Sequence, residues 1–171
     1  GRVADASLTV APVVHHFGWA WDDWDRLAAA TVAGHLIECG AQVTGGLWTR
    51  WQDVPDLARV GYPIVVCQAN GDFVVTKPAG TGGAVNRETV SEQLLYEVND
   101  PAAYLTPDVI ADFTSVDIEE RGADEVAVCG AKGKPAPDAY KVSIAYQDGF
   151  TASGTLVIAG PQAAAKARWA G

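Results

Sequence analysis

The stretch that decides the fold is residues 22–46, which read DDWDRLAAATVAGHLIECGAQVTGG. Between positions 22 and 39 it has no proline and one glycine, and its second half is apolar almost all round, which predicts one long buried helix. Asp22 or Asp23 can cap the start of this helix, and Gly40 fits the left-handed position just past its end. The rest of the chain is therefore expected to pack around residues 22–39.

The last turns of this helix carry three chemically able side chains on one face. At 100° per residue, His35, Glu38 and Cys39 point the same way, toward the glycines that follow. We predict a catalytic group with Glu38 as general base, His35 as acid or electrophile, and Cys39 as supporting group or nucleophile. Backbone N–H groups near Gly45 and Gly46 would hold an oxyanion.

A purely structural explanation of the same three residues stands beside this one. A free cysteine is among the most buried residue types, and a histidine near the end of a core helix often just satisfies a carbonyl. Glu38 follows an apolar run and needs a partner, so its structural explanation is a buried ion pair. A weaker alternative adds Asp5 to the three as metal ligands, whereas our prediction is that no metal is bound.

Composition bounds the class of protein. The chain has 171 residues, of which 49% are hydrophobic and 19% charged, enough for one sizeable core. The chain has only 12 basic residues and a net charge of −9. This balance argues against binding to the phosphates of a nucleic acid. No apolar run has membrane-spanning length and no leader is visible, which predicts no membrane association and a cytoplasmic protein. The three cysteines lack zinc-site spacing, and a start without Met predicts a processed, engineered or partial chain.

The remaining pattern predicts an α+β fold or an α/β fragment, with the long helix on a mixed or antiparallel sheet. Asn70-Gly71 between two apolar runs signals a hairpin, and Asn86 can cap the next helix. We predict helices at 8–17, 87–98 and from 161, and strands at 63–69, 72–77, 113–119, 125–130, 139–146 and 150–159. Residues 1–171 form one domain or part of a larger one, with a helix-rich lobe at 1–110 and a β-rich lobe of hairpins at 111–171.

A glycine-rich loop precedes the helix that Asn86 caps. Free N–H groups, a positive helix end and one ammonium make such a loop an anion cradle, although its spacing matches no nucleotide fingerprint. A flexible connector explains the loop equally well. The residues that we predict to grip phosphate or line the site are Lys77, Gly80, Thr81, Gly82, Gly83 and, from the chain start, Arg2.

Ordered blocks along nearly the whole chain resemble the acyclic terpene utilisation (AtuA-type) family. These blocks are residues 1–7, 34–40, 44–46, 76–78, 82–83, 88–90, 92–97, 104–109 and 137–141. Members of that family are much longer and carry a nucleotide-fold-like α/β portion ahead of the first block. The resemblance therefore implies that this chain is the later part, with a companion polypeptide supplying the missing N-terminal portion, or a homo-oligomer.

For function, the resemblance implies a pathway. It implies no assigned reaction whose steps could be given to particular residues of this chain. It implies a role in degrading branched acyclic acyl-CoA compounds of the citronellol and geraniol type, so that the substrate is a coenzyme A thioester. Our first hypothesis is an enzyme with lyase or hydratase chemistry. The second is a non-catalytic assembly subunit, in which the same motifs are packing. Convergence of His35, Glu38, Lys77 and Gly82 on one pocket would favour the enzyme.

Overall fold

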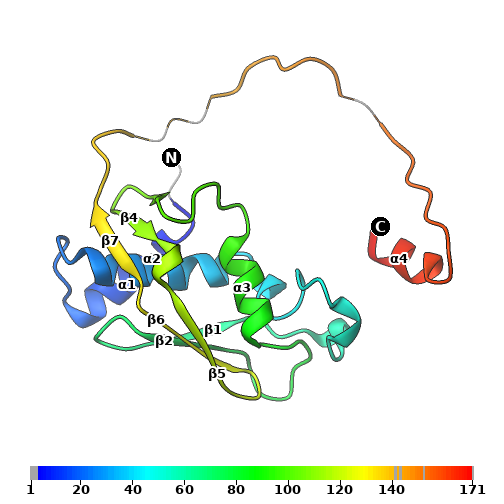
Figure 1. Cartoon of the computed structure of the whole chain (residues 1–171), viewed down its shortest axis with the longest axis horizontal. Helices are drawn as coiled ribbons and strands as arrows, with labels where there is room; N and C mark the ends of the chain where they lie inside the picture. The colour runs from blue at the N-terminus through cyan, green and yellow to red at the C-terminus, as the bar shows by residue number, and fades with distance from the viewer. Residues whose placement is uncertain (1–3, 141, 143, 152, 171) are drawn as a thin grey trace. The chain divides into compact units, whose positions relative to one another are not determined.

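The computed structural model describes residues 4–140, 142, 144–151 and 153–170, and the chain divides into two units, Gly1–Lys141 and Val142–Gly171 (Figure 1). The first unit holds three α-helices and all the strands assigned within the described ranges. The second contributes one helix, α4 (Ala163–Ala170), which confirms the helix predicted to start at Pro161. The α+β class predicted from the sequence is confirmed.

Helix α2 (Trp24–Glu38) lies at the centre of the first unit, as residues 22–46 predict. Asp23 caps it by accepting a hydrogen bond from the Arg26 N–H, and Gly40 follows it with a φ of 58°, so both helix ends are confirmed. Ten consecutive residues, from Leu27 to Leu36, are buried. An α-helix that is apolar all round has no face to give to water, so other elements cover every side of it.

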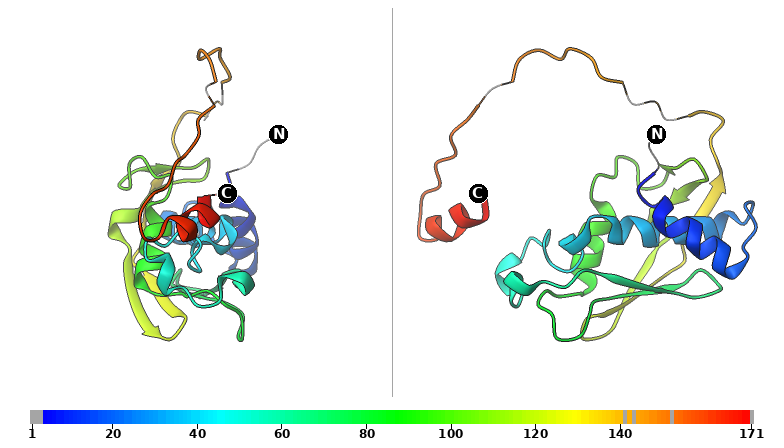
Figure 2. Two further views of the ribbon diagram at one scale, coloured as in Figure 1. Left: turned by 90° about the vertical axis from the view of Figure 1, so that its right-hand side faces the viewer. Right: turned by 180° about the vertical axis from the view of Figure 1, so that it is seen from behind.

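Helix α1 (Ser7–Phe17) lies along α2, as the views in Figure 1 and Figure 2 show. The two helices come close because Gly34 has no side chain: a Cβ there would lie 2.8 Å from the Ala6 carbonyl oxygen. This contact places the start of α1, with Asp5, near the C-terminal end of α2. Helix α3 (Arg87–Leu95) also contacts α2 and ends three residues earlier than predicted.

The larger sheet has four antiparallel strands in the order β1-β2-β6-β5. The predicted hairpin is confirmed, since β1 (Ile64–Cys67) pairs with β2 (Phe73–Thr76) across Asn70-Gly71. A second hairpin joins β5 (Asp117–Gly122) to β6 (Glu125–Cys129), and β6 pairs with β2. Alternate residues of β2 and β6 are buried in the core around α2.

The smaller sheet has the order β3-β4-β7, with β3 at Tyr104–Leu105, β4 at Val109–Asp112 and β7 at Lys132–Pro135. Strands β4 and β7 both pack on α2. Gly133 makes the approach possible, because a Cβ there would overlap the Trp24 carbonyl. The Asp25 carboxylate then accepts hydrogen bonds from the Gly133 N–H at 3.0 Å and the Lys132 ammonium at 2.8 Å.

Some predicted boundaries are wrong. Residues 132–135 form β7 although the sequence indicates a turn, and the strand predicted at 113–119 begins as a 3-10 helix (Phe113–Ser115). The strands predicted at 139–146 and 150–159 do not form: the residues described there have no regular structure. Their alternation of apolar side chains is a strand pattern, but none of these described residues has a pairing partner, and a strand needs one.

Candidate functional site

His35 lies in the last turns of α2 and is buried, with 4% of its surface exposed. Its Nε2 lies 3.1 Å from the Gln93 carbonyl oxygen, and the Gln93 side-chain amide donates to the His35 carbonyl oxygen at 3.3 Å. Nε2 must therefore carry a proton and donate it to that carbonyl. Burial lowers the pKa of the imidazole below 6.5, and nearby Glu38 only partly offsets this, so the ring is neutral at pH 7.

Two aromatic rings enclose the imidazole. The ring centroids of Tyr104 and Phe113 each lie 5.4 Å from that of His35, and the two rings stack on each other at 4.7 Å. Burial raises the pKa of the Tyr104 hydroxyl, and the negative charges of Glu38, Asp5 and Glu97 raise it further. At the end of α2 the imidazole is thus covered by aromatic rings, with carboxylates nearby.

Cys39 and Glu38 contact each other directly. The Cys39 thiol donates to Glu38 Oε1 at 2.7 Å, and Glu38 is exposed, unlike the buried ion pair that the sequence allows. Burial raises the pKa of the Cys39 thiol to about 11, and Glu38 adds to the rise. Since only a thiolate is a strong nucleophile, the raised pKa makes Cys39 a poor nucleophile in this arrangement. The three predicted residues share one helix end, but their environments differ: His35 is enclosed, while Glu38 faces solvent.

Gln93 is a member of this group that the sequence analysis missed. It is fully buried in α3, and its Oε1 has no hydrogen-bond partner among the described residues. The sequence shows Gln93 only as one polar residue in an amphipathic helix. Its single signal is its place directly before Leu94 and Leu95, next to the apolar stripe of that helix.

The glycine-rich loop is held by contacts within the protein. The Lys77 ammonium donates to the Thr81 carbonyl at 2.9 Å and pairs with Asp124 at 3.0 Å, and its side chain is only 7% exposed. Gly82 and Gly83 donate their N–H groups to backbone carbonyls, each at 2.8 Å. A Cβ on Gly82 would overlap the Asp56 carbonyl. Of the predicted phosphate-gripping residues, Gly80 lies exposed at the loop tip.

Gly45 and Gly46 also have their N–H groups occupied. Gly45 donates to the Gln42 carbonyl at 3.1 Å and Gly46 to the Ala41 carbonyl at 2.9 Å. A Cβ on Gly46 would lie 2.8 Å from the Ala41 oxygen, so these glycines serve a tight turn after α2. The predicted role of Arg2 lies outside the described residues. No contact that we observe joins Lys77 or Gly82 to His35 or Glu38.

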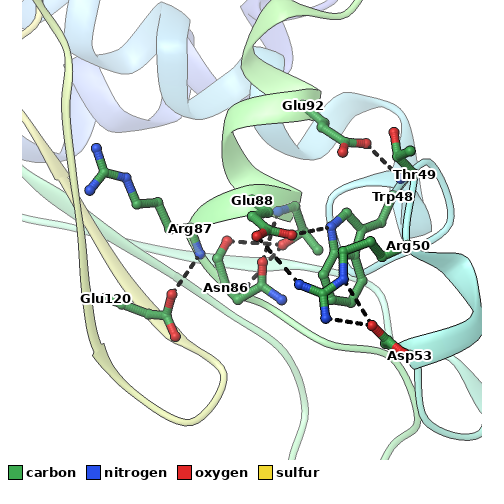
Figure 3. Close-up of polar contacts among 10 residues, drawn as sticks. Trp48, Thr49, Arg50, Asp53, Asn86, Arg87, Glu88, Glu92 and Glu120 are labelled. Carbon is green, nitrogen blue, oxygen red and sulfur yellow. Dashed lines mark hydrogen bonds and ion pairs between the residues drawn. The ribbon is translucent and has the colours of Figure 1, made fainter.

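The N-terminus of α3 is closed by protein groups (Figure 3). Asn86 and Thr89 form the predicted cap as a reciprocal capping box, and Glu120 accepts from the Arg87 N–H at 3.0 Å. A carboxylate already occupies the positive end of this helix, where the sequence analysis placed a phosphate.

Two glutamates of α3 hold the loop that follows the tight turn. Glu88 accepts from the Trp48 indole N–H at 2.9 Å and pairs with Arg50 at 3.6 Å, while Glu92 accepts from the Thr49 N–H at 2.9 Å (Figure 3). The Arg50 guanidinium lies 5.3 Å from the centroid of the Trp48 ring. This cluster was not predicted, because its members are 40 or so positions apart in the sequence.

Two surface pockets lie elsewhere. One, of about 190 Å³, is lined by the hairpin turn at Asn70 and by Asp25 and Lys132, and another, of about 270 Å³, lies between α1 and β1. Neither is lined by His35, Glu38, Cys39 or Lys77. Within the described ranges no group of three or more His, Cys, Asp or Glu side chains could hold a metal ion. No described helix is long and apolar enough to cross a membrane.

Comparison with known proteins matches residues 1–171 to one family model, that of the acyclic terpene utilisation family protein AtuA. No curated protein and no solved structure matches the chain. The match covers every block on which the resemblance was based, from the first residues to the end of the sequence. The chain belongs to the acyclic terpene utilisation family.

Proposed function

We propose that this chain serves the cytoplasmic breakdown of branched acyclic acyl-CoA compounds as an assembly or binding part of a larger acyl-CoA-processing complex. Family membership supports the pathway. The contacts of the reactive side chains support the non-catalytic role, because each of them is engaged within the protein. A companion polypeptide with the nucleotide-fold-like portion would then supply the catalytic groups.

The observation that carries this proposal is the state of the side chains at the end of α2. A catalytic cysteine needs a lowered pKa, whereas that of Cys39 is raised to about 11. An acid–base histidine needs access to substrate and a pKa near 7, whereas His35 is buried, neutral and bonded to the Gln93 carbonyl. Lys77, which would hold a phosphate of coenzyme A, is already paired with Asp124. These groups stabilise the fold as they stand.

The second candidate is acid–base catalysis by the same cluster, and one observation favours it. Glu38 is exposed beside Cys39 and lies in the same electrostatic neighbourhood as Tyr104. A carboxylate that reaches solvent can abstract a proton next to a thioester carbonyl, and the Tyr104 hydroxyl could then donate to the developing oxyanion. In this alternative the phosphates of coenzyme A would bind around Gly80, the exposed glycine of the loop.

One experiment separates the two candidates. The tagged chain is isolated natively with its companions, and turnover of a geraniol-type branched acyl-CoA is measured for the wild type, Glu38→Gln and Cys39→Ser. The assembly role predicts turnover within about twofold of wild type for both variants. The matched control is Glu119→Gln, which neutralises another exposed carboxylate. A loss of 100-fold or more in Glu38→Gln alone, with the complex intact by mass spectrometry, would overturn the assembly role.

A further inference from the structure

The turn between β1 and β2 holds a pair of residues that is chemically labile. Of the chain's asparagines, Asn70, Asn86 and Asn99, only Asn70 is followed by a glycine. Asparagine is a thermolabile residue, and a glycine after it has no Cβ to keep its backbone nitrogen away from the asparagine side chain. The Gly71 nitrogen can therefore attack the side-chain carbonyl carbon of Asn70, which is exposed at the turn.

The closed turn engages each of the reacting groups in another bond. The Gly71 N–H donates to the Gln68 carbonyl at 3.0 Å. The Asn70 Oδ1 accepts from the Asp72 N–H at 3.1 Å, and the Asn70 Nδ2 donates to the Asp72 carboxylate at 2.7 Å. Gly71 is also buried, and a Cβ on it would lie 3.3 Å from the Ala29 Cβ of α2. Attack on the Asn70 side chain breaks these bonds, so it requires the turn to open.

We propose that Asn70 is a modification site, at which opening of the turn between β1 and β2 leads to loss of the side-chain amide as ammonia. In the open turn the Gly71 N–H gives its proton to water, and the nitrogen forms a bond to Asn70 Cγ. The Cγ–Nδ2 bond then breaks, and the departing nitrogen takes up a proton and leaves as ammonia. A succinimide ring remains. Water adds to one of its carbonyl carbons and opens it, so one water is consumed for each ammonia released, and nothing is oxidised or reduced.

The products fit the turn less well than asparagine does. Hydrolysis gives either an aspartate at position 70 or an isoaspartate, in which the main chain runs through the former side chain. The aspartate has a carboxylate where Asn70 Nδ2 donates to Asp72, so two negative groups meet across a contact of 2.7 Å. The isoaspartate adds a methylene to the main chain next to Gly71, which is packed on α2. The open turn thus reacts, and its product favours the open turn.

The first test follows the full 171-residue chain at pH 8 by peptide mass spectrometry, which detects the mass gain of about 1 Da at each asparagine. Asn70 is expected to react at least about tenfold more slowly in the folded chain than in the chain unfolded by urea. Asn99, which is exposed outside the helices and strands, corrects for the effect of urea itself.

A variant tests the bonds that hold the Asn70 side chain closed. Asp72→Ala removes the carboxylate that accepts from Asn70 Nδ2, so Asn70 should react several-fold faster in the folded variant than in the folded wild type. The matched control is Asp117→Ala, which removes an exposed carboxylate from β5 and should leave the rate at Asn70 unchanged.

Three results of these measurements would overturn the proposal. If Asn70 in the unfolded chain reacts no faster than Asn99, the site is not a labile one. Equal rates at Asn70 in the folded and unfolded chains would show that the turn does not control the reaction. A rate in Asp72→Ala that is unchanged or lower would show that the contacts of Asp72 do not protect Asn70.

The second test concerns the product and uses urea denaturation. Asn70→Asp introduces the carboxylate directly and should lower the urea midpoint relative to the wild type. Adding Asp72→Asn to this variant should recover most of the loss, because the new amide can donate to the carboxylate at position 70. A midpoint that Asn70→Asp leaves unchanged, or a loss that the double variant keeps in full, would refute the claim that the product favours the open turn.

Discussion

The end of α2 and the glycine-rich loop both carry residue types that suggest catalysis, yet they are built differently. At the end of α2, Glu38 reaches solvent and accepts a hydrogen bond from the neighbouring Cys39 thiol. In the loop, Lys77 is enclosed and bonded to Asp124 and to the Thr81 carbonyl, and Gly82 lies against the Asp56 backbone. The difference teaches that a reactive residue type marks a site only where its polar atoms remain available.

The comparison predicts that the loop is sensitive to small changes, and Gly82→Ala tests this most severely. The added Cβ would lie 2.7 Å from the Asp56 carbonyl carbon and would also meet its oxygen, so backbone must move. We expect a loss of about 3 kcal/mol in the free energy of unfolding, measured by urea denaturation.

The matched control for Gly82 is Gly80→Ala in the same loop. Gly80 has open space around it, and its φ of 78° alone should cost about 1 kcal/mol. Equal losses for the two variants would mean that the loop is not held as closely as the structure shows.

A second change removes the charge that holds Lys77. Asp124 has a φ of 55°, a conformation that asparagine tolerates, so Asp124→Asn keeps the backbone and leaves the enclosed ammonium without its counter-ion. The carboxylate is 38% exposed, so the cost should be below that of a fully buried pair, about 2 kcal/mol. Glu119→Gln, which breaks the exposed pair with Arg121, should cost under about 0.5 kcal/mol by the same denaturation assay.

The third prediction concerns the pH dependence that His35 creates. Its pKa in the folded state lies below 6.5, so the unfolded chain takes up a proton that the folded chain does not. Stability from this group is present above pH 6.5 and is lost as pH falls toward the folded pKa, by at most about 1.4 kcal/mol per pH unit. Denaturation at pH 7.5, 6.5 and 5.5 should show this slope, and His35→Gln should flatten it. If His35→Gln leaves the slope of stability against pH unchanged, a titrating group other than His35 causes that slope.

The smallest expected effect is on the reactivity of Cys39. With a pKa of about 11, the thiol should react with iodoacetamide at pH 8 roughly 100-fold more slowly than a thiol with a pKa of 9. Glu38→Gln removes a negative charge that raises this pKa, so it should speed alkylation several-fold. Peptide mass spectrometry separates Cys39 from Cys67 and Cys129. If wild-type Cys39 is alkylated at the rate of a free thiol, Glu38 does not accept its proton in a hydrogen bond or raise its pKa.

Local features of the fold were predictable from the sequence, and distant ones were not. The Asn70-Gly71 hairpin and the Asp23 and Asn86 caps depend on a few neighbouring residues, and all of them are confirmed. The His35–Gln93 bonds join residues 58 positions apart. Strand β7 was missed because Lys132-Gly-Lys-Pro has the composition of a turn, whereas its pairing with β4 makes it a strand.

The same limit applies to the candidate site. Helical spacing correctly brings Glu38 and Cys39 together, but it says nothing of which residue is enclosed. That is decided by Tyr104, Phe113 and Gln93, which arrive from other elements. The ion pair between Lys77 and Asp124 depends on the position of the turn between β5 and β6. No local pattern near residue 77 encodes that position.

Helix α3 grips two separate parts of the molecule, and this has a mechanical consequence. Through Glu88 and Glu92 it holds the Trp48–Arg50 loop, and the next residue after Glu92, the buried Gln93, exchanges two hydrogen bonds with His35. A helix of nine residues moves as one rigid body. A partner that displaced the Trp48 loop would therefore also displace the His35 imidazole. The short rod of α3 would thus report events at the surface to the enclosed end of α2.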